Sequence, residues 1–148
     1  MANSNFTRSL MTLFLMFIGF LSNAQEKIID EWELPKTARD FISMNFPQQK
    51  ILKITREGTG IEKEYEAFLD NSVKIEFDNL GYWKEVDGKN TAISTKFILR
   101  NILEYIEDKY PNEKIGKIEK DPEKYEVELL NGIQLEFNLK GKFLRIDN

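Results

Sequence analysis

The sequence predicts an α+β fold of two tandem repeats, each a helix followed by a four-stranded antiparallel meander. The first observation is a duplication, because residues 125–147 repeat residues 65–87 at a constant offset of 60 positions. The second is the alternation of apolar and polar residues in both copies, which is the period of half-buried strands. The third is a segment with apolar residues at helical spacing before each copy. Together they predict an eight-stranded sheet with both helices on one face, and a pseudo-two-fold axis between the halves.

Each helix is predicted from a start signal and a proline that ends it. Leu34-Pro35 opens the first helix, because proline suits the first helical position, and Phe46-Pro47 ends it. The second helix takes Ser94 or Thr95 as its cap and stops at Tyr110-Pro111.

A strand follows each helix directly, over residues 48–56 and 115–120. In the first of these we expect Leu52 and Ile54 to face the core. The turn 87–90 separates the halves. We therefore predict one compact domain that consists of a first repeat, 34–88, and a second repeat, 89–148.

The loop between the second and third strands of each repeat sets their register. Leu130-Asn131-Gly132 has the form of a three-residue hairpin loop with glycine in the left-handed position. In the first repeat Ser72 stands where this glycine is expected. We still expect the same register in both repeats, because the hydrophobic patterns agree.

This register places Glu126 opposite Glu136, and Glu66 opposite Glu76, on the polar face of the sheet. Like charges that face each other cost up to about 1 kcal/mol. A chain selected for stability alone would avoid these pairs.

Residues 1–24 are predicted to be a secretory signal peptide. Arg8 precedes an apolar run over 10–21, and Ser22-Asn23-Ala24 forms a small-residue cleavage site. The run is too short to span a bilayer, which needs about 20 apolar residues. We therefore expect a periplasmic or secreted protein with no membrane span. Residues 25–33 are a polar lead in which Ile28, Ile29 and Trp32 are candidates to tether the chain.

Composition excludes several classes of function. The chain has 148 residues, a formal net charge of −4, and neither cysteine nor histidine. It therefore lacks thiol nucleophiles, Ser-His-Asp triads and the commonest zinc ligand. The lysines are scattered among carboxylates, so there is no basic surface of the kind that binds nucleic acid. Glycoside hydrolysis needs only two carboxylates, but these carboxylates lie on an open face. We predict no enzyme activity and no cofactor, and we assign no catalytic residue and no metal ligand.

The candidate site is the acidic face of the sheet, which we expect to bind a basic surface on a protein or peptide partner. Charge complementarity would speed association and select partners, while aromatic residues would supply most of the affinity. The residues assigned to partner binding are Glu64, Glu66, Phe68, Glu76, Asp78, Tyr82, Glu126, Glu128 and Glu136.

Two other interpretations use the same carboxylates. In one, they gather calcium weakly in a calcium-responsive periplasmic structural domain, since calcium prefers several oxygen ligands. Lys124 stands in the second repeat where the first has Glu64, which weakens this hypothesis. In the other, the carboxylates are only a solvated face that keeps the domain soluble.

A repeated sequence signature resembles that of a known family. The pattern Tyr-Glu-x-x-Leu-x-Asn-Gly, then Glu-Phe and Gly-x-Phe, runs from Tyr125 to Phe143. It is similar to the PepSY-like family of secreted bacterial proteins, also described as β-lactamase-inhibitor-like, and the resemblance covers residues 34–147. It implies a small exported domain of tandem α/β repeats that binds or inhibits another protein, and it transfers no catalytic residue. The sequence departs from the pattern at Ser72 and at an insertion over 57–60, both in the first repeat.

Overall fold

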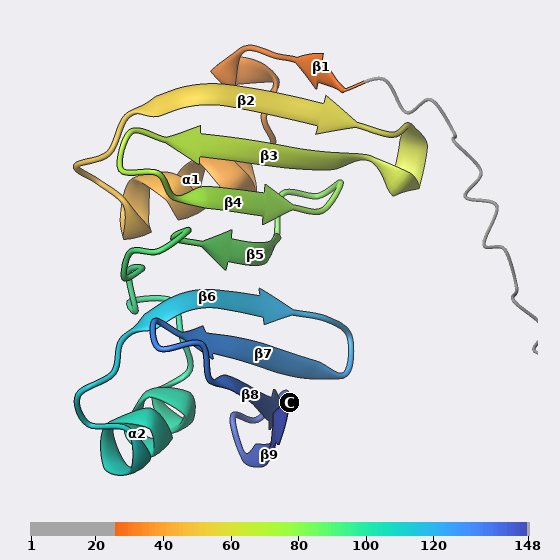
Figure 1. The fold of residues 1–148 in the computed structure, drawn as a ribbon. Helices are drawn as coiled ribbons and strands as arrows, with labels where there is room; N and C mark the ends of the chain where they lie inside the picture. Colours follow the sequence, from red (N-terminus) through yellow and green to blue (C-terminus); the bar gives the residue numbers. More distant parts are fainter. Residues whose placement is uncertain (1–25, 148) are drawn as a thin grey trace, which may run out of the picture.

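Nine antiparallel strands form one open, twisted sheet in the computed structural model, which describes residues 26–147 (Figure 1). The strands lie in the sheet in the order in which they occur in the chain. They are β1 (Lys27–Ile28), β2 (Ile51–Glu57), β3 (Glu64–Leu69), β4 (Lys74–Phe77), β5 (Trp83–Asp87), β6 (Ile115–Lys120), β7 (Lys124–Leu129), β8 (Gln134–Asn138) and β9 (Phe143–Asp147). The signal peptide predicted over 1–24 lies outside the described residues.

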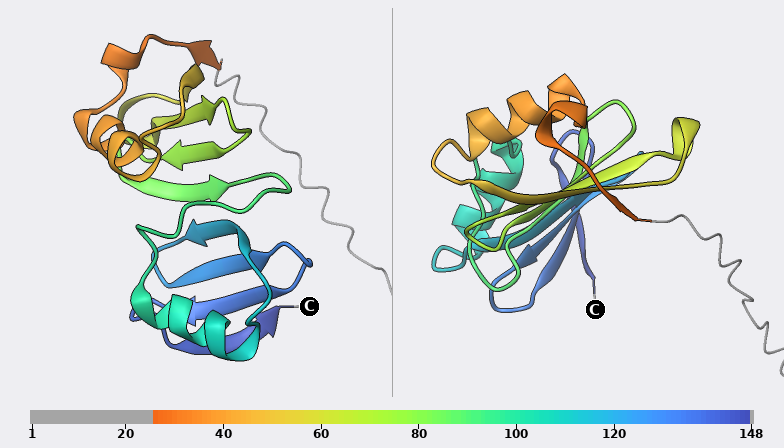
Figure 2. Two further views of the ribbon diagram at one scale, coloured as in Figure 1. Left: turned by 90° about the vertical axis from the view of Figure 1, so that its left-hand side faces the viewer. Right: turned by 90° about the horizontal axis from the view of Figure 1, so that it is seen from above.

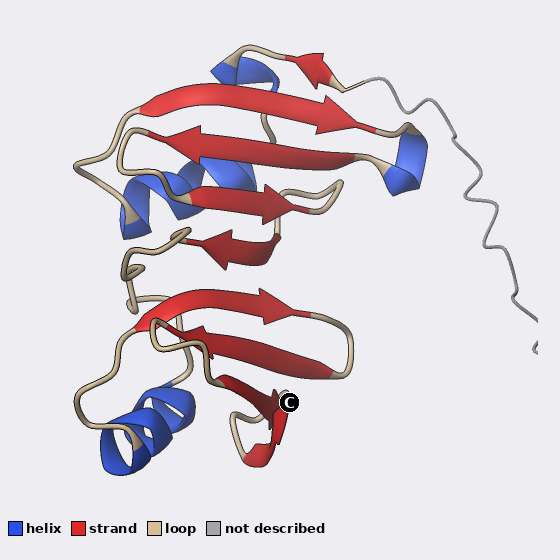
Figure 3. Ribbon diagram, in the orientation of Figure 1, coloured by secondary structure: helices blue, strands red, loops and turns tan. Residues whose placement is uncertain are grey.

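Two helices, α1 (Lys36–Asn45) and α2 (Arg100–Lys109), lie on the same side of the sheet (Figure 2). Each buries one apolar stripe, which includes Ile42 in α1 and Ile102 in α2. Two short 3-10 helices, Glu31–Glu33 and Gly60–Glu62, lie in the connections (Figure 3). Neither of the two α-helices is long and apolar enough to cross a membrane.

The predicted fold class is confirmed, with one strand more than expected. The ninth strand is β1, which the lead forms along the edge of β2 by pairing Lys27 with Arg56 and Ile28 with Thr55. Of the three candidate tether residues only Ile29 is buried, while Trp32 is 73% exposed. The lead is therefore held by strand pairing and by Ile29.

The relation between the repeats is a second difference from the prediction. The last strand of the first repeat, β5, pairs with the first strand of the second, β6. This head-to-tail order relates the repeats by a shift along the sheet combined with its twist. A two-fold axis would instead bring together the same strand of both repeats.

Both helices end just before the predicted Phe46-Pro47 and Tyr110-Pro111, whereas the start of α2 differs from the prediction. Phe46 and Tyr110 follow the last helical residues and donate their N–H groups to Ile42 and Ile106. The predicted cap of α2 at Ser94 or Thr95 is wrong, because Leu99 precedes its first residue.

The hairpin loops form as predicted in both repeats. Gly132 and Ser72 have φ angles of +88° and +70°, so the serine adopts the same left-handed conformation as the glycine. Their N–H groups donate to the carbonyl oxygens of Leu129 and Leu69, at 2.9 Å and 3.1 Å. Register is therefore conserved between the repeats.

Aromatic residues pack between each helix and the sheet. The ring centroids of Phe41 and Phe77 are 5.9 Å apart beneath α1, and those of Tyr105 and Phe137 are 5.5 Å apart beneath α2. The prediction for Leu52 is wrong, because a bulge in β2 turns it outward and leaves it 69% exposed. Both α-helices of the described residues lie on one side of the sheet, so the polar face on the far side carries neither of them (Figure 2).

Candidate functional site

Six glutamates form a continuous row across the open face of the sheet. The register aligns one glutamate from each strand between β3 and β8, and Thr55 on β2 and Arg145 on β9 end the row. We call this set the glutamate row: Glu66, Glu76, Glu85, Glu119, Glu126 and Glu136.

The two glutamate pairs predicted to oppose each other do so, but sequence reasoning missed the two glutamates that join them. Glu66 lies opposite Glu76, and Glu126 opposite Glu136. Glu85 was missed because a bulge after Trp83 shifts the alternation of β5 by one residue, so that Glu85 faces outward.

Glu119 lies opposite Glu85 across the junction of the repeats. Sequence reasoning missed Glu119 because strand pairing between the repeats cannot be read from the pattern of either repeat alone. The residue equivalent to Glu119 in the first repeat is Thr55, so comparing the two repeats does not reveal a carboxylate at this position.

In the first repeat a single ammonium lies among three carboxylates. The Nζ atom of Lys74 donates a hydrogen bond to Glu76 and lies 3.6 Å from Glu66 and 3.4 Å from Glu85. The lysine side chain is only 17% exposed. Burial opposes the ammonium charge, but the hydrogen bond to Glu76 and the surrounding carboxylates outweigh it and raise the pKa of Lys74.

At the junction between the repeats, Lys117 is a second cation beside Glu85 and also lies near Glu119. Its Nζ atom lies 2.7 Å from Glu85 and 3.9 Å from Glu119. Burial raises the pKa of Glu119, and the charge of Glu85 adds to this effect while Lys117 opposes it. Burial likewise raises the pKa of Glu66, with Lys74 opposing and Glu76 adding.

In the second repeat two cations pair with the glutamates of β7 and β8 that belong to the glutamate row. The Nζ atom of Lys124 lies 2.6 Å from both Glu126 and Glu136, and Arg145 contacts both oxygens of Glu136 at 2.9 Å. Hydrogen bonds from Arg145 and Lys124 lower the pKa of Glu136. Lys124 therefore bridges the opposed pair Glu126 and Glu136, as Lys74 bridges Glu66 and Glu76.

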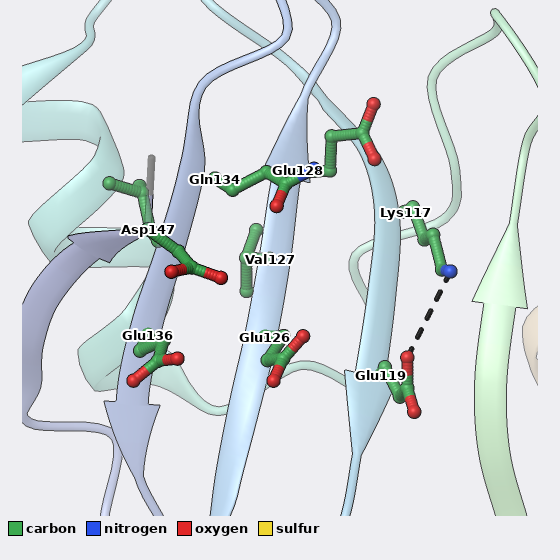
Figure 4. Close-up of a pocket in the computed structure, with 9 residues that line it drawn as sticks. Lys117, Glu119, Glu126, Val127, Glu128, Gln134, Glu136 and Asp147 are labelled. Carbon is green, nitrogen blue, oxygen red and sulfur yellow. Dashed lines mark ion pairs between the residues drawn. The ribbon is translucent and has the colours of Figure 1, made fainter. Parts of the chain in front are cut away.

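A shallow hollow lies on the open face of the second repeat (Figure 4). Gln134 lies between Glu128 and Asp147 in the register. Neither of these two carboxylates has an ion-pair partner within residues 26–147. The offset of 60 positions makes Gln134 the counterpart of Lys74. The second repeat therefore has an uncharged amide at the position where the first repeat has a lysine. Its lining is Lys117, Glu119, Glu126, Val127, Glu128, Gln134, Leu135, Glu136 and Asp147.

The remaining predicted site residues have different environments. Glu64 pairs with Lys84, and the ring of Phe68 lies 4.5 Å from the Nζ atom of Lys53. Tyr82 is 60% exposed beside the turn between β4 and β5.

Asp78 has a structural role, since its carboxylate accepts the N–H groups of Leu80 and Tyr82, each at 2.9 Å. Asn138 does the same in the second repeat. Asp78 therefore also stabilises the turn between β4 and β5. Within residues 26–147, no three carboxylates are grouped so that they could hold a metal ion.

Comparison with known proteins identifies one family along most of the chain. The model of the family described as beta-lactamase-inhibitor-like, PepSY-like matches twice, over residues 21–71 and 63–145. The two matches overlap at residues 63–71, and the second includes much of the first predicted repeat as well as the second. No functionally curated protein matches the chain.

Solved structures of three bacterial proteins are similar over most of their length, each with a TM-score of 0.78. One is a periplasmic protein of Bacteroides thetaiotaomicron proposed to be calcium-regulated, which is 37% identical and matches 83% of this chain and 97% of its own. Two periplasmic proteins of Bacteroides vulgatus are 35% and 31% identical, over 84% and 83% of this chain and 98% and 99% of theirs. The second of these is described as of unknown function.

Proposed function

Because the chain belongs to the PepSY-like, beta-lactamase-inhibitor-like family, we propose that it is an exported, non-enzymatic module that binds another protein through the acidic face of its sheet. Export is supported by the periplasmic descriptions of the three relatives and by the signal peptide that the sequence predicts. A binding role is supported by the open face itself, which carries neither of the two α-helices.

The observation that carries the proposal is the difference between Lys74 and Gln134. In the first repeat the ammonium of Lys74 fills the space among three carboxylates. In the second repeat Gln134 leaves a hollow bordered by Glu128 and Asp147. We expect a lysine or arginine side chain of a partner to enter this hollow, because its charge would meet Glu128 and Asp147, which have no ion-pair partner within residues 26–147.

Apolar side chains beside the acidic surface suit a protein partner better than a free ion. Tyr82 is 60% exposed, Leu130 is 43% exposed, and Phe68 is partly buried on the open face itself. Such residues supply contact area, while the carboxylates select a basic partner and speed its association.

The test is affinity capture from the envelope and culture fluid, with immobilised wild type beside a variant in which Glu66, Glu76, Glu126 and Glu136 are changed to glutamine. We expect a protein that wild type retains and that the variant loses. A control with the same charge change on exposed residues elsewhere should retain it: Glu31, Glu62, Glu107 and Glu123 changed to glutamine. Equal retention by all three proteins would contradict the proposal.

Calcium binding in the same hollow is the second candidate function. The relative proposed to be calcium-regulated is 37% identical, and the oxygens of Glu128, Gln134 and Asp147 are of the kind that calcium prefers. A ligand that binds only the folded state raises the melting midpoint. A midpoint that rises with millimolar calcium in wild type, but not in Gln134→Lys, would favour calcium. An unchanged midpoint would exclude it.

A further inference from the structure

The strands β5 and β9 are equivalent in the two repeats, but only β5 is covered on its outer edge. Val86 on β5 is fully buried, whereas its counterpart Ile146 on β9 is 47% exposed. The strand β6 covers β5 by pairing Ile118 with Val86 and Lys117 with Asp87. β9 is the last strand of the sheet, and within residues 26–147 no strand pairs with its outer edge.

The opposite edge of the sheet is protected by the chain itself. The lead forms β1 along β2, and Ile29 continues this pairing by donating its N–H to the carbonyl oxygen of Ile54 at 3.0 Å. Exposed edges present unpaired N–H and C=O groups to other strands, and proteins usually shield them. β9 is therefore the edge available for pairing with another strand.

The covered edge of β5 shows what a strand on β9 must supply. β6 places an apolar residue opposite Val86 and a base opposite Asp87. By equivalence, a strand antiparallel to β9 needs an apolar residue opposite Ile146 and a base opposite Asp147. It also needs an acid opposite Arg145, whose guanidinium contacts Glu136 and is 64% exposed.

A second β9 strand, placed antiparallel to the first with the two Ile146 residues opposite each other, meets all three requirements. We propose that β9 pairs with β9 of a second copy of this chain, about a two-fold axis at Ile146. Arg145 of each copy then faces Asp147 of the other, and the two Ile146 side chains cover each other. Because the axis is perpendicular to the sheet, both acidic faces lie on the same side of the dimer.

The helix of the second repeat leaves room for this pairing. α2 packs on β9 through Tyr105 and Phe143, whose ring centroids are 4.5 Å apart. α1 packs on β5 in the equivalent way through Phe41 and Trp83, at 6.2 Å. β5 pairs with β6 although α1 packs on β5. We therefore expect that α2 does not prevent a strand from pairing with β9.

The test is the mass in solution of the chain that begins at Gln25, measured by sedimentation equilibrium. We expect wild type to approach twice the mass of one chain as concentration rises. Asp147→Arg should weaken dimerisation at least about tenfold, because each new guanidinium would face Arg145 of the other copy. Asp70→Arg makes the same charge change on an exposed turn between β3 and β4 and should behave as wild type.

Cross-linking locates the interface independently of the proposed binding function. The chain has no cysteine, so Ile146→Cys introduces a single thiol at the proposed axis. A short bismaleimide should join two copies through this thiol, and should not join copies of Asp70→Cys. A wild type that has the mass of one chain at every concentration overturns the proposal. So does a dimer that survives Asp147→Arg and is not cross-linked at position 146.

Discussion

The two repeats share one backbone register but differ in how their carboxylates are neutralised. In the first, Lys74 lies within reach of Glu66, Glu76 and Glu85. In the second, Lys124 and Arg145 neutralise the row from its sides, and Gln134 replaces the central lysine. A duplicated fold can therefore keep its core and its hairpins while a few substitutions change the charges on its surface.

The core should respond alike in both repeats. Phe77 and Phe137 are fully buried at equivalent positions, each against an aromatic ring of the helix above. Phe77→Ala and Phe137→Ala should each lower the free energy of unfolding by about 3–5 kcal/mol, because each leaves a large cavity. Denaturant titration measures this loss. A large difference between the two variants would show that the repeats also differ in their cores.

Removal of the central ammonium should be costly in the first repeat. Lys74→Met leaves three carboxylates close together, and we expect a loss of roughly 2 kcal/mol, between the values for exposed and buried ion pairs. Lys84→Met is the matched control, since Lys84 is 41% exposed and pairs only with Glu64, and should cost less than about 1 kcal/mol. Equal losses in chemical unfolding would mean that Lys74 has no special role.

Neutralising one glutamate should have opposite effects in the two repeats. The folded-state pKa of Glu66 is raised, so its charge disfavours folding at neutral pH and this penalty disappears as pH falls through that pKa. Glu66→Gln should therefore stabilise the fold near neutral pH, by less than about 1 kcal/mol.

The pKa of Glu136 is lowered in the folded state, so its charge stabilises the fold above its unfolded pKa. That contribution is lost as pH falls through the folded pKa. Glu136→Gln should destabilise the protein near neutral pH, and its effect should fade in acid. Unfolding curves at neutral and acidic pH would separate the two variants. The same sign for both would contradict the comparison between the repeats.

Periodicity predicted the fold class because local patterns dominate a meander. Strand order follows chain order, so short hairpins define most of the topology. The loop at Gly132 sets the register of its hairpin, and Ser72 reproduces it despite the missing glycine. The start of α2 and the extra strand β1 depend on packing that no local signal encodes.

The sequence predicted the two opposed glutamate pairs of the candidate site, but not the continuous glutamate row that contains them. Glu66 with Glu76 follows from hairpin register alone. Glu85 and Glu119 join the pairs through a bulge and through the contact between the repeats, which are both tertiary features. The hollow at Gln134 becomes visible only when the environment of Lys74 is known.

The most direct test of the central claim is to fill the hollow with the missing ammonium. Gln134→Lys places a lysine between Glu128 and Asp147, at the position that Lys74 occupies between Phe68 and Asp87 in the first repeat. The fold should be as stable as wild type or more so, by up to about 1 kcal/mol. Gln48→Lys adds the same charge on an exposed loop and serves as the control.

In the capture experiment we expect Gln134→Lys to lose the partner that wild type and Gln48→Lys retain. A Gln134→Lys variant that is folded and still retains the partner as well as wild type would contradict the account.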